Sequence, residues 1–421
     1  MTGLTRGRLD AAVSALQVVL GLTRPADAAL GLFFRDHPEL GQHDRAFVAE
    51  LVFAVLRHLR LLEHLADEPQ PRRLALAALS LILGFSVREL SPLLARGDDT
   101  WLARARACDQ AGLPLATRTS LPDWLYDRLA RERTGPELEA LAHGLLQPAP
   151  LDLRVNTMLV KRDEVLAAFE RTGIPAIATR YSPAGIRLEG KPQLQRHPLF
   201  LDGKVEVQDE GSQLLAYLVA PRRREMVVDF CAGAGGKTLA LGVLMHSEGR
   251  LYAFDTAAKR LANLRPRLRR SALSNVHPQL IAGAGDARVK RLAAKIDRVL
   301  VDAPCSGLGT LRRNPDLKWR QRPQSVTEMA HKQRVILEAA AGLLKPGGRL
   351  VYATCSLLQE ENEAVVDGFL SAHPQFAEVH CGEILRRQGI ELDTGQRFRV
   401  FPHSHAMDGF FAAVLERTKS G

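Results

Sequence analysis

The chain has 421 residues, of which 46% are hydrophobic and 25% are charged. This balance is typical of folded globular proteins and excludes a disordered chain, and the length suffices for about three domains. Lysine and arginine number 57 against 47 acidic residues, a net charge of +10, which favours a polyanionic partner; by charge alone, a soluble protein that happens to be basic is an equal alternative.

Membrane, secretory and metal-binding classes have little support. The longest apolar run covers residues 74–87, too short for the roughly 20 residues that span a bilayer. The apolar stretch after Arg8 has helical spacing and no clear cleavage site, so it predicts a core helix and not a signal peptide. An odd number of cysteines without a Cys-x-x-Cys pair argues against disulfides and zinc and for a reducing cytoplasm: Cys108, Cys231, Cys305, Cys355 and Cys381.

The front of the chain predicts an all-α domain. From Asp44 onward apolar residues recur at every third or fourth position, which indicates an amphipathic helix with Asp44 as its N-cap. Similar patterns continue until Pro, Thr and Ser concentrate at residues 113–122, as in a linker. We therefore expect a helical domain over residues 1–118.

Two further domains are predicted after this linker. Helical stretches at 124–131 and 163–172 alternate with strand-like runs at 151–156 and 185–188, which favours a small α+β domain over residues 119–204. From residue 205 to 421 apolar strands and helices alternate repeatedly. That rhythm predicts a parallel sheet covered on both faces, with the chemistry at the carboxyl ends of its strands.

A strand, a glycine-rich loop and a helix start follow one another between Glu225 and Thr238. Glycines let the backbone approach a ligand and the helix N-terminus offers free N–H groups, so the segment predicts a nucleotide-type site. It departs from the dinucleotide pattern at Thr238 and from the Walker A pattern at Cys231. The run Gly236-Lys237-Thr238 nevertheless keeps a phosphate-loop NTPase as the first alternative.

Two later acids favour a nucleoside ligand. Asp255 ends the next predicted strand, 20 residues after Gly235, where a doubly wound sheet presents a carboxylate to ribose hydroxyls. Asp286 follows an apolar run and a glycine turn, and we expect it to accept from the adenine amino group. A solvated loop acid is the alternative for Asp286.

Two consecutive predicted strands each end in a cysteine that is followed by serine. The first runs from Asp297 to Asp302 and leads to Cys305, and the second ends at Cys355. Consecutive strands usually neighbour one another and ligands lie at their carboxyl ends, so both cysteines should face one cleft. A single buried cysteine is more often a small hydrophobic residue than a nucleophile, but two at equivalent strand ends predict chemistry.

Methylation of cytosine at carbon 5 would use such a pair. Addition of a thiolate to C6 turns C5 into an enamine carbon that attacks a methyl donor, and a second group must then help to remove the C5 proton. Asp302 is placed to assist the addition near N3. A free thiol has a pKa of about 8.5, so it needs activation by a nearby cation or a helix N-terminus. The spacing leaves open which cysteine attacks.

These residues resemble the RsmB/NOP (NSUN-type) family of S-adenosylmethionine-dependent RNA cytosine-C5 methyltransferases. The resemblance covers about residue 121 to the C-terminus and rests mainly on Asp302-Ala-Pro-Cys-Ser-Gly307 and Thr354-Cys-Ser356. It implies a Rossmann-like class I methyltransferase sheet after an RNA-recognition-motif-like domain, with Cys355 as nucleophile and Cys305 assisting release. Residues 45–53 are similar to the NusB-type domain of bacterial ribosomal members, which points to small-subunit ribosomal RNA.

The resemblance also implies the sites. The loop from Cys231 to Lys237 is similar to the family's methyl-donor loop, with Gly233-Ala234 where the family often has Ala-Pro. The implied catalytic residues are Cys355, Cys305, Asp302 and Lys237. The implied donor-binding residues are Cys231, Ala232, Gly233, Ala234, Gly235, Gly236, Lys237, Asp255, Asp286 and Asp302.

Basic residues in or beside the last domain predict where RNA phosphates run. With 5% aromatic residues, recognition should rest on phosphates and shape, and a paired target base must be unstacked to react. We expect a monomer, and a non-catalytic RNA-binding assembly protein on a retained methyltransferase fold is the second alternative. The basic residues are Arg222, Arg223, Arg224, Arg265, Arg267, Arg269, Arg270, Arg312, Arg313, Lys318, Arg320 and Arg322.

Overall fold

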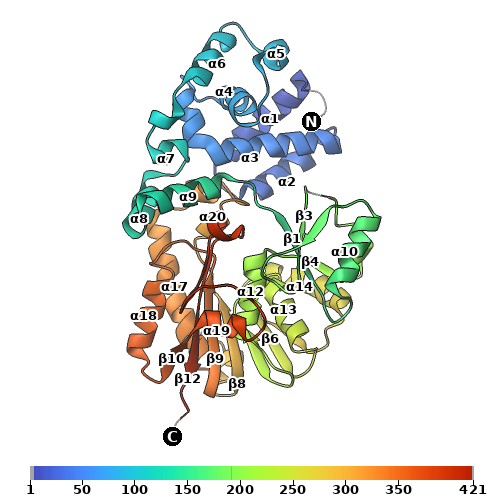
Figure 1. The fold of residues 1–421 in the computed structure, drawn as a ribbon, viewed down its shortest axis with the longest axis vertical. Coiled ribbons are helices and arrows are strands. Elements are labelled where there is room, and N and C mark those ends of the chain that lie inside the picture. Colours follow the sequence, from blue (N-terminus) through green and yellow to red (C-terminus); the bar gives the residue numbers. More distant parts are fainter. Residues whose placement is uncertain (1–3, 191, 420–421) are drawn as a thin grey trace. The chain divides into compact units, whose positions relative to one another are not determined.

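A computed structural model describes residues 4–190 and 192–419. The chain folds into two compact units (Figure 1): residues 1–148 with 310–323, and residues 149–309 with 324–421. The first unit thus includes a segment far along the sequence. The domain boundaries at 118 and 204 stay predictions.

The first unit is all-α. The apolar stretch after Arg8 lies in α1 and packs into the core, and none of the helices in the described residues is both long and apolar enough to cross a membrane. The unit contains α1 (Arg6–Val19), α2 (Ala26–Asp36), α3 (Gln42–Leu65), α4 (Pro71–Ala77), α5 (Val87–Leu90), α6 (Asp98–Ala107), α7 (Leu115–Arg118), α8 (Asp123–Glu132), α9 (Gly135–Leu146) and α16 (Leu317–Arg320).

The prediction of Asp44 as an N-cap was wrong by three residues. Helix α3 begins at Gln42 with Gly41 as its N-cap, and Asp44 lies in the first turn, where its carboxylate accepts from the Gly41 amide at 3.2 Å. Asp44 therefore stabilises the N-terminus of the helix from a position within its first turn, and not as the N-cap.

Helix α3 is interrupted at His58, whose φ of −111° and ψ of 20° are not helical. Two donors of the segment 310–323 reach carbonyl oxygens next to this kink. Trp319 Nε1 donates to Leu56 O and Lys318 Nζ donates to Arg57 O, both at 2.8 Å. The Trp319 ring also packs against the apolar core of the unit, so the segment that follows Gly309 in the sequence is part of the helical fold.

The second unit begins with a small antiparallel sheet of order β2-β3-β1-β4. Its apolar face packs on α10 (Arg162–Arg171) through Val165 and Phe169, and α11 (Pro198–Leu201) precedes the last strand. The predicted runs 151–156 and 185–188 are strands β1 and β3. The four strands are β1 (Leu151–Val155), β2 (Ala176–Ala178), β3 (Gly185–Leu188) and β4 (Val205–Val207).

The larger sheet has the order β10-β12-β9-β8-β5-β6-β7, and β11 pairs with β12. Strands β9, β8, β5, β6 and β7 are parallel, whereas β12 runs antiparallel to its neighbours. Figure 1 shows helices on both faces of this sheet. The strands are β5 (Met226–Asp229), β6 (Arg250–Asp255), β7 (Val276–Leu280), β8 (Ile296–Asp302), β9 (Leu344–Thr354), β10 (Phe376–Val379), β11 (Phe398–Val400) and β12 (Phe410–Arg417).

Two apolar clusters, one on each face, form the core of this sheet. The predicted α/β class with a Rossmann-like sheet is confirmed. The sheet order reverses at β5, and sheets of this kind bind ligands at the carboxyl ends of the strands beside such a reversal, here β5, β6, β8 and β9. The further helices of this unit are α12 (Glu210–Val219), α13 (Gly236–Leu244), α14 (Ala258–Ser271), α15 (Ala287–Lys290), α17 (Pro323–Ala341), α18 (Glu363–Ala372), α19 (Cys381–Arg386) and α20 (Pro402–His405).

Candidate active site

Two cysteines meet at the carboxyl ends of β8 and β9. The Sγ atoms of Cys305 and Cys355 lie 3.4 Å apart, within hydrogen-bonding distance for sulfur. The loop after Cys305 is fastened to the second strand end, because the Gly309 amide donates to Cys355 O at 2.8 Å. A Cβ atom on Gly309 would lie 2.1 Å from Gly409 O, so only glycine permits this approach.

The surroundings distinguish the thiols of the chain. The hydrogen bond to Cys355, together with burial, raises the pKa of Cys305 well above its usual value. Burial also raises the pKa of Cys231 and raises that of Cys381 to about 12. Cys305, Cys231 and Cys381 therefore stay protonated at neutral pH.

A cation, Lys237, lies close enough to Cys355 to interact with it electrostatically. Lys237, in the first turn of α13, donates to Asp302 Oδ2 at 2.8 Å, and these side chains are only 12% and 30% exposed. Burial opposes the charge of Lys237, but the ion pair with Asp302 outweighs it and raises the pKa of Lys237. Asp302 thus has a charged partner at the end of the strand that leads to Cys305.

The glycine loop between β5 and α13 has the conformation of a ligand-binding turn. Gly233 and Gly235 have φ of 56° and 87°, values that favour glycine. Asp255 ties the loop to the end of β6: its Oδ2 accepts from the Gly233 amide at 2.8 Å and its Oδ1 from the Ala257 amide at 2.6 Å. Each carboxylate oxygen keeps a second lone pair for a ligand hydroxyl.

Asp286 stabilises the start of a helix. It is the N-cap of α15, and its oxygens accept from the amides of Ala282 and Arg288, both at 2.8 Å. These hydrogen bonds lower the pKa of Asp286. Its contact with an adenine amino group stays a prediction.

Asp229, at the end of β5, is a residue of the site that sequence reasoning missed. Its Oδ2 accepts from Thr238 Oγ1 at 2.7 Å, whereas its buried Oδ1 has no hydrogen-bond partner within the described ranges. Burial raises the pKa of Asp229 to about 7. A buried oxygen without a donor beside a glycine loop fits a ligand that brings a donor. The signal was present, because Asp229 ends its strand as Asp255 and Asp302 end theirs.

The basic residues that were predicted to contact RNA differ in their burial and in their acidic partners. Arg267 and Arg270 pair with Glu206 at 2.9 and 2.6 Å, so they tie α14 to β4. The prediction that Lys318 faces RNA was wrong: it is 3% exposed in the helical unit, where burial lowers its pKa. Arg312 is buried there as well, because both belong to the segment that packs beside α3.

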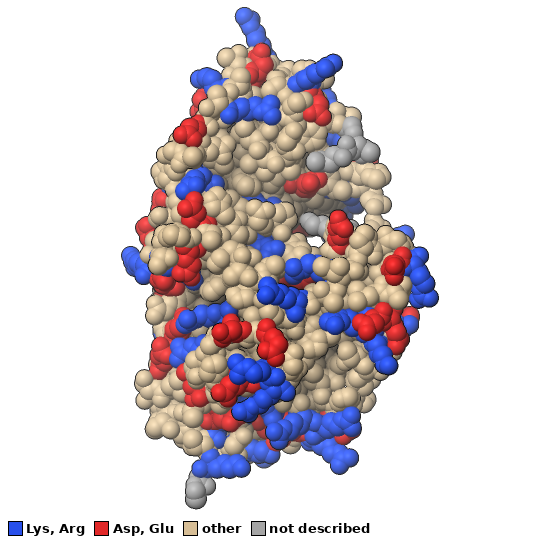
Figure 2. All heavy atoms as spheres, in the orientation of Figure 1, with Lys and Arg blue, Asp and Glu red and all other residues tan. Residues whose placement is uncertain are grey.

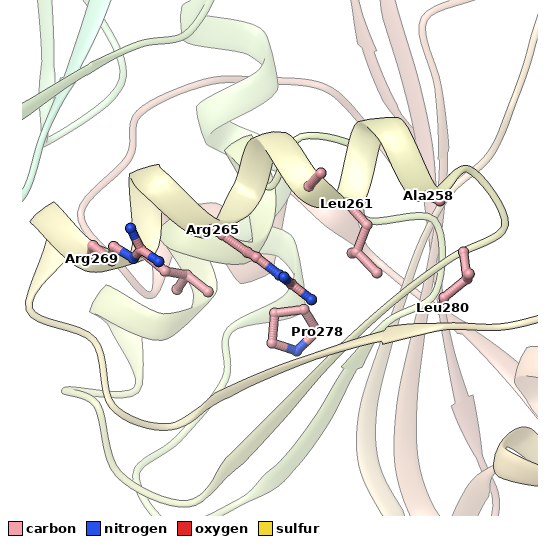
Figure 3. A pocket seen from close by; sticks show the side chains of 8 residues that line it. Ala258, Leu261, Arg265, Arg269, Pro278 and Leu280 are labelled. Carbon is pink, nitrogen blue, oxygen red and sulfur yellow. The ribbon is translucent and has the colours of Figure 1, made fainter.

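Arg265 and Arg269 are arranged differently. They line an open hollow of about 510 Å³ between α14 and the edge strand β7. Figure 3 shows both side chains projecting from α14, with Arg265 directed toward Pro278. Over most of the face in Figure 2 positive and negative side chains are interspersed, so a local arrangement such as this hollow is a better guide to an anion site than net charge.

The 16S rRNA methyltransferase RsmB/F family model matches residues 216–416, and the ferredoxin-like domain model of the same proteins matches residues 121–195. A probable ribosomal RNA small subunit methyltransferase B from Synechocystis is 33% identical, over 93% of this chain and 95% of its own length. The chain belongs to the RsmB/F family of methyltransferases. The family resemblance is thereby confirmed.

Other comparisons agree with this membership. The Vibrio cholerae ribosomal RNA small subunit methyltransferase B is 31% identical over 97% of this chain and 96% of its own length. The solved structure of PH0851 has a TM-score of 0.79 at 26% identity, covering 99% of both chains. NSun6 from Pyrococcus horikoshii, solved with SFG, shows the same fold with a TM-score of 0.63 at 21% identity, covering 71% of this chain and 99% of its own.

Proposed function

We propose that this methyltransferase modifies carbon 5 of a cytosine in small-subunit ribosomal RNA, with Cys355 as nucleophile and Cys305 as the residue that completes release. The observation that supports this most is the sulfur contact of 3.4 Å next to the Lys237–Asp302 ion pair. S-adenosylmethionine, when bound, supplies the electrophilic methyl group. Methyl transfer to an atom that is already a good nucleophile needs no cysteine pair, whereas transfer to carbon 5 of cytosine does.

In the proposed first step, the sulfur of Cys355 bonds to C6 of the cytosine. Electron density moves from the C5–C6 double bond toward N3, and a proton delivered at N3 stabilises it. The ion pair between Lys237 Nζ and Asp302 Oδ2, whose atoms lie 2.8 Å apart, would supply such a proton. Asp302 would contact the ring edge and pass the proton to N3, and Lys237 would replace the proton on Asp302; before this transfer, the charge of Lys237 would favour the attacking thiolate.

In the proposed release step, Cys305 has lost its own proton to solvent and takes the proton from C5 as a thiolate. The electron pair of the C5–H bond re-forms the C5–C6 double bond, and the C6–sulfur bond breaks so that Cys355 leaves as a thiolate. The contact with Cys355 is the main reason that the pKa of Cys305 is raised in the free protein. Once the sulfur of Cys355 is bonded to C6, it carries no negative charge and accepts hydrogen bonds poorly. The pKa of Cys305 should then fall, so that this thiol gains the ability to act as a base only after addition.

The donor site is proposed at the glycine loop. The loop from Cys231 to Lys237 would surround the amino-acid end of the donor, with Asp229 as an acceptor for its ammonium group. Asp255 would accept from the ribose hydroxyls and Asp286 from the adenine amino group. The unpartnered oxygen of Asp229 and the left-handed glycines support this assignment.

The hollow lined by Arg265 and Arg269 is proposed as a contact for RNA phosphates. It combines two arginines with an exposed edge strand and contains no acidic lining residue.

The free state of the five cysteines suits the expected cytoplasmic setting. The monomeric state stays a prediction.

The proposal is tested by methylating small-subunit RNA from a strain that lacks the gene, using donor with a labelled methyl group. Bisulfite sequencing then locates any new 5-methylcytosine. Label in one cytosine at carbon 5 is expected, and label at another atom or base would refute the chemistry. Hydrolysis of ATP without donor binding would instead favour the phosphate-loop NTPase. RNA binding without transfer, unchanged by Cys355→Ala, would favour an assembly protein.

A further inference from the structure

A carboxylate outside the proposed chemistry lies between the two cysteine-bearing segments. Glu361, in the turn between β9 and α18, has no exposed surface. No lysine or arginine forms an ion pair with it in the part of the chain that the structure describes. Burial of an unpaired charge is costly unless hydrogen bonds stabilise it, so its donors indicate what it does.

Four donors reach Glu361. Its Oε1 accepts from the Ser306 amide at 2.8 Å and from Gln333 Nε2 at 3.1 Å. Its Oε2 accepts from the hydroxyls of Ser306 and Ser356, each at 2.5 Å. Ser306 follows Cys305 and Ser356 follows Cys355, so one carboxylate holds the residue next to each thiol.

The turn that carries Glu361 is itself fixed. Tyr352 Oη donates to Glu361 O at 2.5 Å, and Asn362 Nδ2 donates to Ser356 O at 3.1 Å. On the other side, Gln333 Nε2 also donates to Pro304 O at 2.9 Å, next to Cys305. The carboxylate therefore connects two segments that are both anchored in the sheet and its covering helices.

We propose that Glu361 is a positioning residue that holds the Cys305 loop and the Cys355 strand end together, so that the two sulfurs stay in contact. Among the described residues, the hydrogen bonds of its carboxylate go to Ser306, Gln333 and Ser356 and not to either sulfur. Its catalytic consequence rests on the function proposed above, because both release by Cys305 and its timing need that contact. Misplacement of a reacting group by about 1 Å can cost about 100-fold in rate.

Two substitutions separate geometry from charge. In Glu361→Gln the amide oxygen can accept from the Ser306 amide and Gln333, and the amide nitrogen can donate to the serine hydroxyls, which rotate to accept. This variant keeps the connection without the charge. Glu361→Ala removes the connection. Glu363→Gln is a matched control, because Glu363 lies two residues away and pairs with Arg399.

The first measurement needs no methyl transfer. The full-length protein is treated with diamide, which takes two electrons and two protons from a thiol pair and becomes its hydrazine. Mass spectrometry follows the disulfide between Cys305 and Cys355. We expect this disulfide to form at least tenfold more slowly in Glu361→Ala and within threefold of the wild-type rate in Glu361→Gln and Glu363→Gln.

The second measurement is turnover. We expect Glu361→Ala to lower kcat at least tenfold, with KM for RNA and for the donor within threefold, and Glu361→Gln to restore kcat to within threefold. Wild-type disulfide rates in folded Glu361→Ala, or equal loss in the Gln and Ala variants, would overturn the proposal. If disulfide rates behave as expected but no cytosine is methylated, the proposed function fails and the positioning role stands.

A second variant tests the proposal even where Glu361→Ala does not fold. Ser306→Ala combined with Ser356→Ala removes both hydroxyl donors and leaves the Ser306 amide and Gln333 on the carboxylate. We expect disulfide formation to slow at least threefold in this double variant. A wild-type rate there would overturn the proposal independently of Glu361→Ala.

Discussion

The Sγ atom of Cys305 lies 3.4 Å from that of Cys355, although the two residues are 50 positions apart in the chain. The contact exists because β8 and β9 are parallel neighbours, with Asp302 paired to Ala353. Equivalent strand ends therefore bring both thiols to one edge of the sheet. Their different surroundings suggest different roles, and this difference can be tested.

Replacing each cysteine should have opposite effects on the covalent intermediate. Cys305→Ala should accumulate a protein–RNA adduct because addition proceeds without release, whereas Cys355→Ala should give neither adduct nor product. Denaturing gel electrophoresis with labelled RNA measures the adduct. Adduct in Cys355→Ala and none in Cys305→Ala would reverse the assignment.

The Lys237–Asp302 pair should behave as one unit. Lys237→Met and Asp302→Asn should each lower kcat by about 100-fold or more, the usual range for loss of acid–base assistance. The double variant should be little worse than the worse single variant, because residues that act together are not additive. Steady-state kinetics on all three checks this, and fully additive losses would show that the two side chains act separately.

Asp229 should make the stability of the protein depend on pH. Its folded pKa of about 7 lies above the ordinary 3.8, so between these values the folded state keeps a proton that the unfolded chain has lost. Stability from this group is present below pH 4 and is lost as pH rises toward 7, by up to about 4 kcal/mol at 1.36 kcal/mol per pKa unit.

Asp229→Asn cannot ionise and should lack this loss. Thermal unfolding is measured without ligand from pH 4 to 8. As pH rises, the stability of the variant relative to the wild type should increase. Parallel curves over the whole range would contradict the burial of this carboxylate with one oxygen, Oδ1, lacking a hydrogen-bond donor within the described residues.

The arginines of the hollow beside α14 should contribute to RNA binding and not to chemistry. Arg265→Gln combined with Arg269→Gln should raise KM for RNA about tenfold with little change in kcat. The slope of log affinity against log salt concentration should become shallower by about one to two, because about one to two phosphate contacts are lost. Filter binding at several salt concentrations measures both.

The control removes two charges elsewhere on the second unit, with Arg386→Gln and Lys419→Gln. Both residues are exposed, and Lys419 follows β12, toward the opposite edge of the sheet from β7. An equal loss of affinity in this control would attribute the effect to net charge and not to the hollow.

Trp319 should stabilise the helical unit although it lies far along the sequence. Trp319→Ala removes the packing of the ring and the hydrogen bond to Leu56 O, and it should lower the free energy of unfolding by about 3 kcal/mol. Trp319→Phe keeps most of the packing and should cost about 1 kcal/mol, the value of one hydrogen bond. Limited proteolysis of residues 1–148 reports the change, and unchanged resistance in Trp319→Ala would contradict this packing.

Much of the architecture followed from local patterns. Alternating strands and helices predicted the parallel sheet, and the strand-end cysteines of the Asp302-to-Gly307 and Thr354-to-Ser356 runs predicted the pair. These inferences succeed because periodicity and strand order are properties of short segments, and parallel neighbours present equivalent ends to one edge.

The sequence by itself determined the family, the sheet and the candidate residues at its strand ends. Only the tertiary structure decided that Glu361 reaches both serines and that Lys318 is buried beside the kink in α3. It also decided that Arg267 pairs with Glu206, whereas Arg265 has no acidic partner among the residues that the structure describes. The reason is physical: such contacts join side chains far apart in the chain, and whether a charge is solvated or paired depends on which distant segment packs against it.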